Sequence, residues 1–322
     1  MTKITMFAVG LVAATISFVG GTDAQVYSLA TNPQGSVFYS TGATISKLMV
    51  EKTGLQFRVA PYAGSTTYVP LINRGELAFG LVNAGEAAFA FSGREIFKGR
   101  PNSNLREVLV PFANDSGFAV KVDSPIRTIA DLKGRKVPVG YVSGRIFHYL
   151  AGAILATAGL TDQDLGGVPV PGFVEGINAF AAGRVDAAYI TLNAAAGREA
   201  MATLSGGWRY LSIGNGPGVA AAMDKVLPSR PHAVHPGKNA VGVAGDPTVL
   251  LQVDFNIIAS ADVPDDVVYK LTRTMYENKP TLVKMLGAFN GFDPKHMAQP
   301  HPTPYHTGAI RFYKEVGLWP PK

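Results

Sequence analysis

Two extended apolar runs decide the fold that this sequence predicts: residues 108–122 read VLVPFANDSGFAVKV, and residues 249–258 read VLLQVDFNII. Both runs are rich in β-branched and aromatic side chains, so each is expected to form a long strand. The two runs lie far apart in the chain, with α/β patterns on either side. A chain that leaves one lobe through the first run and returns through the second makes two hinge strands between two lobes.

Before the first run, the order strand, polar loop, helix occurs three times, which predicts a parallel sheet with helices on its faces. The predicted strands, each with the loop that follows it, are 26–30 with 31–36, 57–60 with 63–66, and 77–82 with 83–86.

Between the two runs the same pattern resumes. A strand at 136–140 leads into the loop 141–145 and a long apolar helix, and a later strand covers 185–191. Thr128 and Asp131 form a capping-box pattern that predicts a helix ending at Gly134. Residues 205–247 show no clear period and are expected to be loops with short strands.

The predicted fold class is therefore α/β: a two-lobe clamshell of the periplasmic-binding-protein type, each lobe a mixed sheet flanked by helices, with two hinge strands. The predicted boundaries are 1–24 for a signal peptide, 25–117 plus 252–322 for lobe 1, and 118–251 for lobe 2.

The composition fits such a chain and excludes several others. The chain has 322 residues, of which 47% are hydrophobic and 16% charged, so it can bury a core and is not disordered. There is no cysteine, which excludes disulfides, thiolate metal sites and a cysteine nucleophile. The net charge is +6, but the basic residues are scattered, so no nucleic-acid partner is expected.

The N-terminus has the order of a secretory signal. Lys3 precedes an apolar stretch over residues 4–19, and small residues stand at Thr22 and Ala24. The alternative is a membrane anchor, but the apolar stretch is shorter than the ~20 residues that span a bilayer. We expect cleavage after Ala24 and export to the periplasm.

Ligands of open α/β sheets bind beyond the carboxyl ends of the strands, so the loops there supply the candidate ligand-binding residues. In lobe 1 these are Asn32, Gln34, Gly35, Ser36, Tyr39, Gly64, Ser65, Thr66, Asn83 and Glu86. In lobe 2 they are Tyr141, Ser143, Gly144, Arg145, Tyr189, Thr191 and Asn193.

Arg145 is the sharpest candidate, because backbone amides at a helix start and a guanidinium together suit a carboxylate. The alternative is an ordinary surface arginine. Ser36 is either a ligand donor or an N-cap, or both. Glu86 either contacts a ligand amine or is a first-turn acid stabilised by the helix dipole. Tyr189 either faces a ligand or belongs to the core.

The sequence carries no motif of a known hydrolase, metalloprotease, P-loop or dinucleotide-binding site, so no enzyme activity and no cofactor are expected. The histidine pairs His232/His235 and His301/His306 lie among prolines without an acidic residue at ligand spacing. No metal site is expected there.

The end of the chain carries a family resemblance. Residues 303–315, TPYHTGAIRFYKE, together with residues 124–140 and 75–82, resemble a TAXI-type solute-binding subunit of a TRAP transporter. The loops 31–36 and 143–145 and Glu86 depart from the usual pattern of that family.

The resemblance implies a monomeric receptor that delivers a small carboxylate-bearing metabolite, similar to glutamate or 2-oxoglutarate, to the membrane subunits of an ion-driven TRAP permease. An ABC-type receptor for an organic anion and a periplasmic enzyme of similar fold remain open alternatives.

Overall fold

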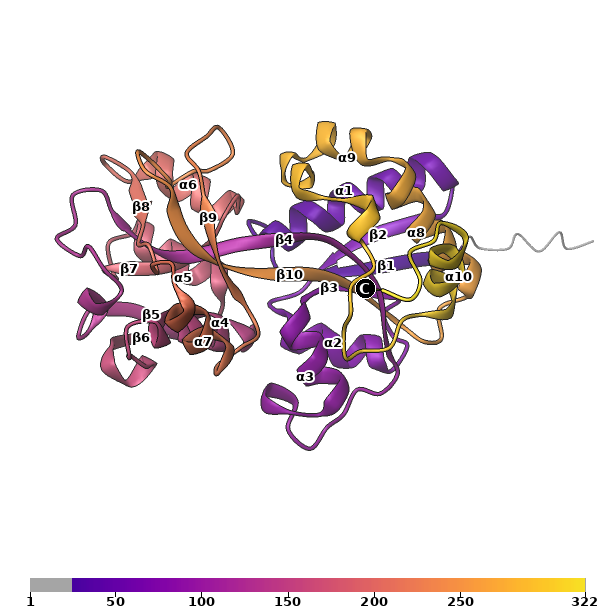
Figure 1. The fold of residues 1–322 in the computed structure, drawn as a ribbon, viewed down its shortest axis with the longest axis horizontal. Helices are drawn as coiled ribbons and strands as arrows, with labels where there is room; N and C mark the ends of the chain where they lie inside the picture. The colour runs from indigo at the N-terminus through magenta and orange to yellow at the C-terminus, as the bar shows by residue number, and fades with distance from the viewer. Residues whose placement is uncertain (1–24, 322) are drawn as a thin grey trace, which may run out of the picture.

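Two lobes joined by a pair of long strands are the main feature of the computed structural model, which describes residues 25–321 (Figure 1). The α/β class predicted from the sequence is confirmed. The predicted signal peptide, residues 1–24, lies outside the described residues.

The strands are β1 (Val26–Thr31), β2 (Gln56–Pro61), β3 (Phe79–Asn83), β4 (Leu105–Lys121), β5 (Lys136–Gly140), β6 (Gly166–Val170), β7 (Ala187–Thr191), β8 (Trp208–Tyr210), β9 (Arg230–Val234) and β10 (Thr248–Ser260). The helices are α1 (Val37–Thr53), α2 (Ser65–Asn73), α3 (Ala84–Ser92), α4 (Ile146–Ala156), α5 (Phe173–Ala181), α6 (Ala195–Thr203), α7 (Pro217–Asp224), α8 (Asp265–Glu277), α9 (Lys279–Met285) and α10 (Thr307–Glu315).

Lobe 1 is built on a mixed sheet with the strand order β2-β1-β3-β10-β4. β1 lies parallel to β2 and β3, and β10 runs antiparallel to β3 and β4. α1 shows why the sequence folds this way: Ser36 caps its N-terminus, Gly54 ends it at a φ of 72°, and Ile45 and Leu48 on its apolar face are fully buried. β3 leads directly into α3, whereas β1 is followed by the loop 32–36 and then by α1.

The two hinge strands are β4 and β10, which cross from one lobe to the other side by side (Figure 1). Their antiparallel register runs from Leu105 opposite Ser260 to Ser116 opposite Leu251, with irregularities between Phe255 and Ile258. Such bulges bend and twist a strand. The predicted domain boundaries at 117/118 and 251/252 fall inside these two strands.

Lobe 2 is not built on one continuous sheet. β7 and β8 pair with β4, and β9 pairs with β10, but β5 and β6 form a separate parallel pair. Among the described residues of β5, Lys136 alone makes hydrogen bonds to the segment just before β7. Its amide donates to the Asp186 carboxylate, and its carbonyl accepts from the Asp186 amide. Pro138 lacks an amide proton, so the middle of β5 cannot donate to a second neighbour.

Two sequence predictions in this lobe are wrong. The expected helix ending at Gly134 is a single 3₁₀ turn, Ala130–Leu132, although Asp131 and Thr128 make the predicted reciprocal bonds. The stretch 205–247 contains a helix, α7, as well as short strands. Met223 is the one fully buried apolar side chain of α7, so no apolar period marks this helix in the sequence.

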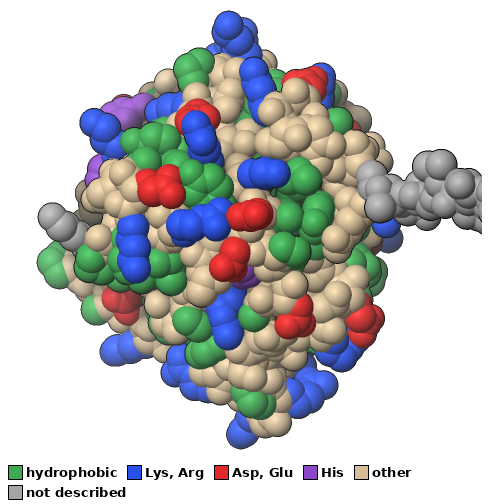
Figure 2. Space-filling model, turned by 90° about the vertical axis from the view of Figure 1, so that its right-hand side faces the viewer, with side chains coloured by type: hydrophobic (Ala, Val, Ile, Leu, Met, Phe, Trp, Pro, Cys, Tyr) green, Lys and Arg blue, Asp and Glu red, His purple; other side chains and the backbone are tan. Residues whose placement is uncertain are grey.

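Charges of both signs are interspersed on the end of lobe 1 that carries α8 and α10, as Figure 2 shows. Arg311 pairs with Asp266 at 2.8 Å, and Arg273 with Glu277 at 2.8 Å. Within residues 25–321, no helix is both long enough and apolar enough to cross a membrane.

Candidate functional site

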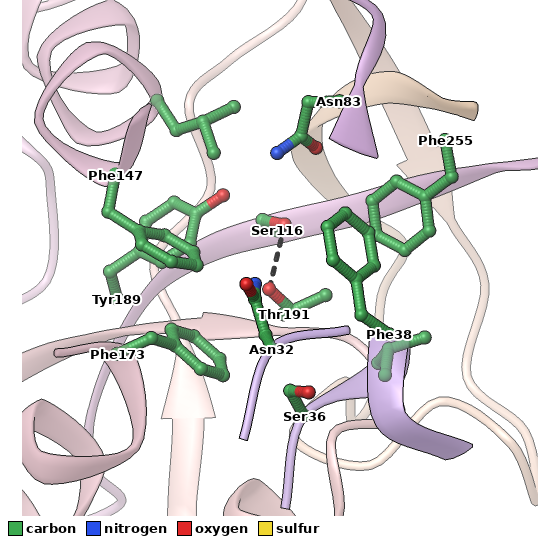
Figure 3. A pocket seen from close by; sticks show the side chains of 12 residues that line it. Asn32, Ser36, Phe38, Asn83, Ser116, Phe147, Phe173, Tyr189, Thr191 and Phe255 are labelled. Atoms are coloured by element: carbon green, nitrogen blue, oxygen red, sulfur yellow. Dashed lines mark hydrogen bonds between the residues drawn. The ribbon is translucent and has the colours of Figure 1, made fainter. Parts of the chain in front are cut away.

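A small cavity between the lobes gathers the polar strand ends of both (Figure 3). It is lined by Asn32, Ser36, Val37, Phe38 and Asn83 from lobe 1, by Phe147, Leu150, Phe173, Tyr189 and Thr191 from lobe 2, and by Ser116 and Phe255 from the hinge strands. This is the place at which an α/β binding protein is expected to hold its ligand.

Aromatic rings form the walls of the cavity. On the lobe 2 side, Phe147 stacks on Phe173 with ring centroids 4.8 Å apart, and Tyr189 packs edge-on against Phe147 at 5.8 Å. On the lobe 1 side, Phe38 meets Phe255 edge-on at 4.5 Å. Figure 3 shows the two groups facing one another across the polar residues. A ligand here would lie between apolar faces.

The polar groups lie between these walls. The hydroxyls of Ser116 and Thr191 are 3.5 Å apart. Asn32 and Asn83 are both buried, and the Asn32 side-chain oxygen has no hydrogen-bond partner among the described residues. A buried acceptor without a partner costs free energy, so a donor from a ligand or a water would stabilise it.

The first turn of α1 also reaches the cavity. The Ser36 hydroxyl accepts a hydrogen bond from the Tyr39 amide at 3.1 Å, which confirms the predicted N-cap. The amides of Val37 and Phe38 have no acceptor within the helix, as at every helix start. Because these two residues line the cavity, the positive end of the α1 dipole is directed toward it.

Among the residues described, none that lines the cavity is Asp, Glu, His, Lys or Arg. Tyr189 is the titratable member of the lining, and burial raises the pKa of its phenol. It is therefore a neutral hydroxyl at physiological pH. The cavity offers hydrogen bonds and a helix dipole but no formal charge.

The lobes touch at the edges of the cavity. The amide of Ala196 in lobe 2 donates to the Gly35 carbonyl at 3.1 Å, and the Arg145 amide donates to the Thr66 hydroxyl at 3.1 Å. Tyr149 donates to Glu95 across the same boundary at 3.0 Å. The free space left inside is about 20 Å³, little more than the room of one water molecule. A molecule larger than a few atoms would therefore fit here only if the lobes moved apart.

The structure places the predicted site residues in three groups. Five of them line the cavity: Asn32, Ser36, Asn83, Tyr189 and Thr191. Others lie where the lobes touch or next to that contact: Gly35, Gly64, Ser65, Thr66, Ser143, Gly144 and Arg145. The remaining ones are not brought to the cavity: Gln34, Tyr39, Glu86, Tyr141 and Asn193.

The surroundings of Arg145 and Glu86 are opposite: Arg145 is exposed and Glu86 is buried. The Arg145 side chain is exposed at the start of α4, outside the cavity lining. Glu86 is fully buried in the first turn of α3 and accepts a hydrogen bond from the Ser65 hydroxyl at 2.7 Å, while its other carboxylate oxygen has no partner among the described residues. Burial raises the pKa of Glu86 to about 7, against the lowering effect of the Ser65 bond.

The sequence analysis missed the aromatic walls. Phe38, Phe147 and Phe173 all stand in the first turn of a helix that follows a strand and its loop. An apolar side chain by itself is equally typical of a core. Their shared position at three helix starts is a signal that would have identified them.

The histidines belong to the ordinary structure. His306 caps α10, where its Nδ1 accepts a hydrogen bond from the Gly308 amide at 3.2 Å. His232 contacts Asp115 on β4 at 2.8 Å. In residues 25–321, no three His, Asp or Glu side chains come together in a way that would hold a metal ion.

The model of the NMT1-like family matches residues 29–317, which is nearly the whole described chain. The chain belongs to the NMT1-like family. That this NMT1-like protein is a TAXI-type subunit of a TRAP transporter, as the sequence resemblance implies, stays a prediction.

Solved structures have the same fold. The alkanesulfonate-binding protein SsuA from Xanthomonas axonopodis pv. citri, solved bound to MOPS, is 18% identical, with a TM-score of 0.50 over 90% of this chain and 83% of that one. A structure described as a periplasmic transporter is 16% identical, with a TM-score of 0.58 over 92% of this chain and 94% of that one. The predicted periplasmic-binding-protein fold is thereby confirmed.

Proposed function

We propose that this NMT1-like protein is an extracytoplasmic solute receptor that captures a small organic acid between its lobes and delivers it to a membrane permease. The observation that carries the proposal is the cavity itself. Side chains from the ends of β1, β3 and β7 and from the hinge strand β4 converge on one enclosed space. Contacts to both lobes favour the closed arrangement, so ligand binding drives closure.

The lining supports a single acid group. An anion would be held by the first turn of α1 and by the neutral donors around it, with Arg145 near the edge of the cleft as a second attraction. A second carboxylate would be buried without a cation, which is costly. The geometry therefore supports a monoacid better than a ligand similar to glutamate or 2-oxoglutarate.

The body of the ligand is apolar or aromatic, because Phe147 and Phe173 face Phe38 and Phe255 across the cavity. It also carries one N–H or O–H group, which satisfies the Asn32 oxygen. An aryl or branched aliphatic carboxylate, or a sulfonate, with a hydroxyl or amino group has these features.

Binding without chemistry is the expected mode. The one titratable side chain of the lining, Tyr189, stays neutral and has no charged partner in the cavity. The MOPS-bound sulfonate receptor of similar fold agrees with this role. The permease is proposed to be of the TRAP type, driven by an ion gradient, with an ABC-type permease as the alternative.

Mass spectrometry of the molecule that copurifies with the exported protein tests the ligand class. Calorimetry with that molecule should give one site per chain, and small-angle scattering should show compaction at saturation. A consumed ligand would indicate an enzyme. Uptake by reconstituted membrane subunits that needs ATP rather than an ion gradient would replace TRAP by ABC.

A further inference from the structure

A second cavity lies in lobe 2, lined by residues of α4, by β5, by the chain at 160–165 and by Val226, which follows α7. Its free space is about 230 Å³, more than ten times that of the cavity between the lobes. The lining is apolar: Phe118, Leu155, Leu160, Leu165 and Val226 form its walls. The lining also has polar side chains: Tyr141, His148, Tyr149, Thr161 and Asp162. His148 and Asp162, 3.4 Å apart, are both half-exposed.

The cavity has causes in the sequence. β5 pairs with β6 in a sheet separate from the main sheet that contains Phe118, and Pro138 has no amide proton with which β5 could bond to a further strand. The face of α4 toward this gap carries Ala151, Gly152 and Ala156, whose small side chains leave the gap open. Close-packed interiors rarely keep a space of this size.

The size and lining define what fits. A cavity of ~150 Å³ lined by apolar side chains binds benzene or xenon. The lobe 2 cavity is larger and mostly apolar, so a substituted single ring or a short branched alkane would fit it. Burial of such a molecule is favourable because it removes apolar surface from water.

We propose that the lobe 2 cavity is a second binding site, distinct from the cleft between the lobes, for a small uncharged apolar molecule the size of a substituted benzene. α4 separates the two sites. Phe147 and Leu150 of this helix line the cleft, whereas Ala151 and Leu155 line the lobe 2 cavity. The proposal stands independently of the function of the cleft.

Toluene is the probe. Titration of the parent protein with toluene, followed by NMR and thermal unfolding, should show one saturable site and a higher unfolding temperature. A crystal soaked with toluene should show the ring between α4 and β5.

Ala151→Leu places three more carbons in the cavity and should weaken toluene binding at least tenfold. Ala221→Leu, the same change at an exposed position of α7, is the control and should bind as the parent does. Should Ala151→Leu fail to fold, Ala156→Leu, at a half-buried lining position, replaces it.

Toluene that binds the filled variants as tightly as the parent would overturn the proposal. So would a parent protein that shows no saturable binding, or a crystal in which the ring lies only in the cleft between the lobes.

Discussion

Gly64 of lobe 1 meets Ser143 of lobe 2 backbone against backbone: a Cβ atom on Gly64 would overlap the Ser143 carbonyl oxygen. The φ of Gly64 is 175°, an extended conformation that any residue adopts. The glycine is therefore required by the contact between the lobes and not by its own backbone.

Gly64→Ala should hold the lobes apart. Overpacking costs about 1–3 kcal/mol, and here that cost falls on the closed arrangement alone, so ligand affinity should drop roughly tenfold to a hundredfold. Small-angle scattering of the variant with ligand should show a larger radius than the parent. Gly218→Ala, where a Cβ meets open space, is the control and should close normally. Unchanged affinity for Gly64→Ala would show that the lobes need not meet at this point.

Asn83 tests the charge of the ligand. It caps α3 without a side-chain bond, so its replacement should leave the unfolding temperature nearly unchanged. Asn83→Ala should weaken binding about tenfold to a hundredfold if its amide donates to an acid group. Asn83→Asp should be weaker again by at least tenfold, because two negative charges would share the cavity. If calorimetry shows that Asn83→Asp binds the ligand more tightly than Asn83→Ala does, the ligand is a cation.

Arg145 remains a proposed contact of the ligand acid at the edge of the cleft. Arg145→Ala should then weaken binding roughly tenfold to a hundredfold, and Arg145→Lys should recover part of that loss, since it keeps the charge without the planar fork. Stability should barely change because the side chain is exposed. If calorimetry gives Arg145→Ala an affinity within twofold of the parent, Arg145 is an ordinary surface residue and does not contact the ligand.

Glu86 should make the stability depend on pH. Burial raises its pKa from 4.5 to about 7, so the folded protein keeps a proton that the unfolded chain loses. Its contribution is present in full below pH 4.5 and is lost as the pH rises to 7, by about 3 kcal/mol. Glu86→Gln should flatten the unfolding free energy over this range in denaturant titrations. Glu107, whose pKa burial raises to about 8, should keep a slope of the same sign. An unaltered slope in Glu86→Gln would mean that Glu86 is ionised in the folded protein.

The signal peptide is predicted to be removed after Ala24. N-terminal sequencing of the exported protein should begin at Gln25. Detection of Met1 in the exported fraction would contradict the prediction.

The sequence by itself determined the parts of this protein that depend on local pattern. The two apolar runs became β4 and β10, and Ser36 caps α1, which is one of the two roles that the sequence allowed it. These features follow from backbone propensity and side-chain periodicity, which act over a few residues. Asn32, Ser36, Asn83, Tyr189 and Thr191 stay predicted ligand contacts. The sequence places them at or just after the ends of strands, and the ends of β1, β3 and β7 line the cavity between the lobes.

Only the tertiary structure decided which face each residue presents. Phe147 and Phe173 have apolar side chains, which are equally typical of a core and of a cleft wall. Only the packing of the two lobes places them, stacked at 4.8 Å, on the cavity beside Tyr189. Glu86 lies in the first turn of α3, one of the alternatives that the sequence allowed, but its full burial and the hydrogen bond from the Ser65 hydroxyl are visible only in the structure. The lobe 2 cavity depends on β5 leaving the sheet after Lys136. Contacts between segments far apart in the chain set all three features, and no local pattern records such contacts.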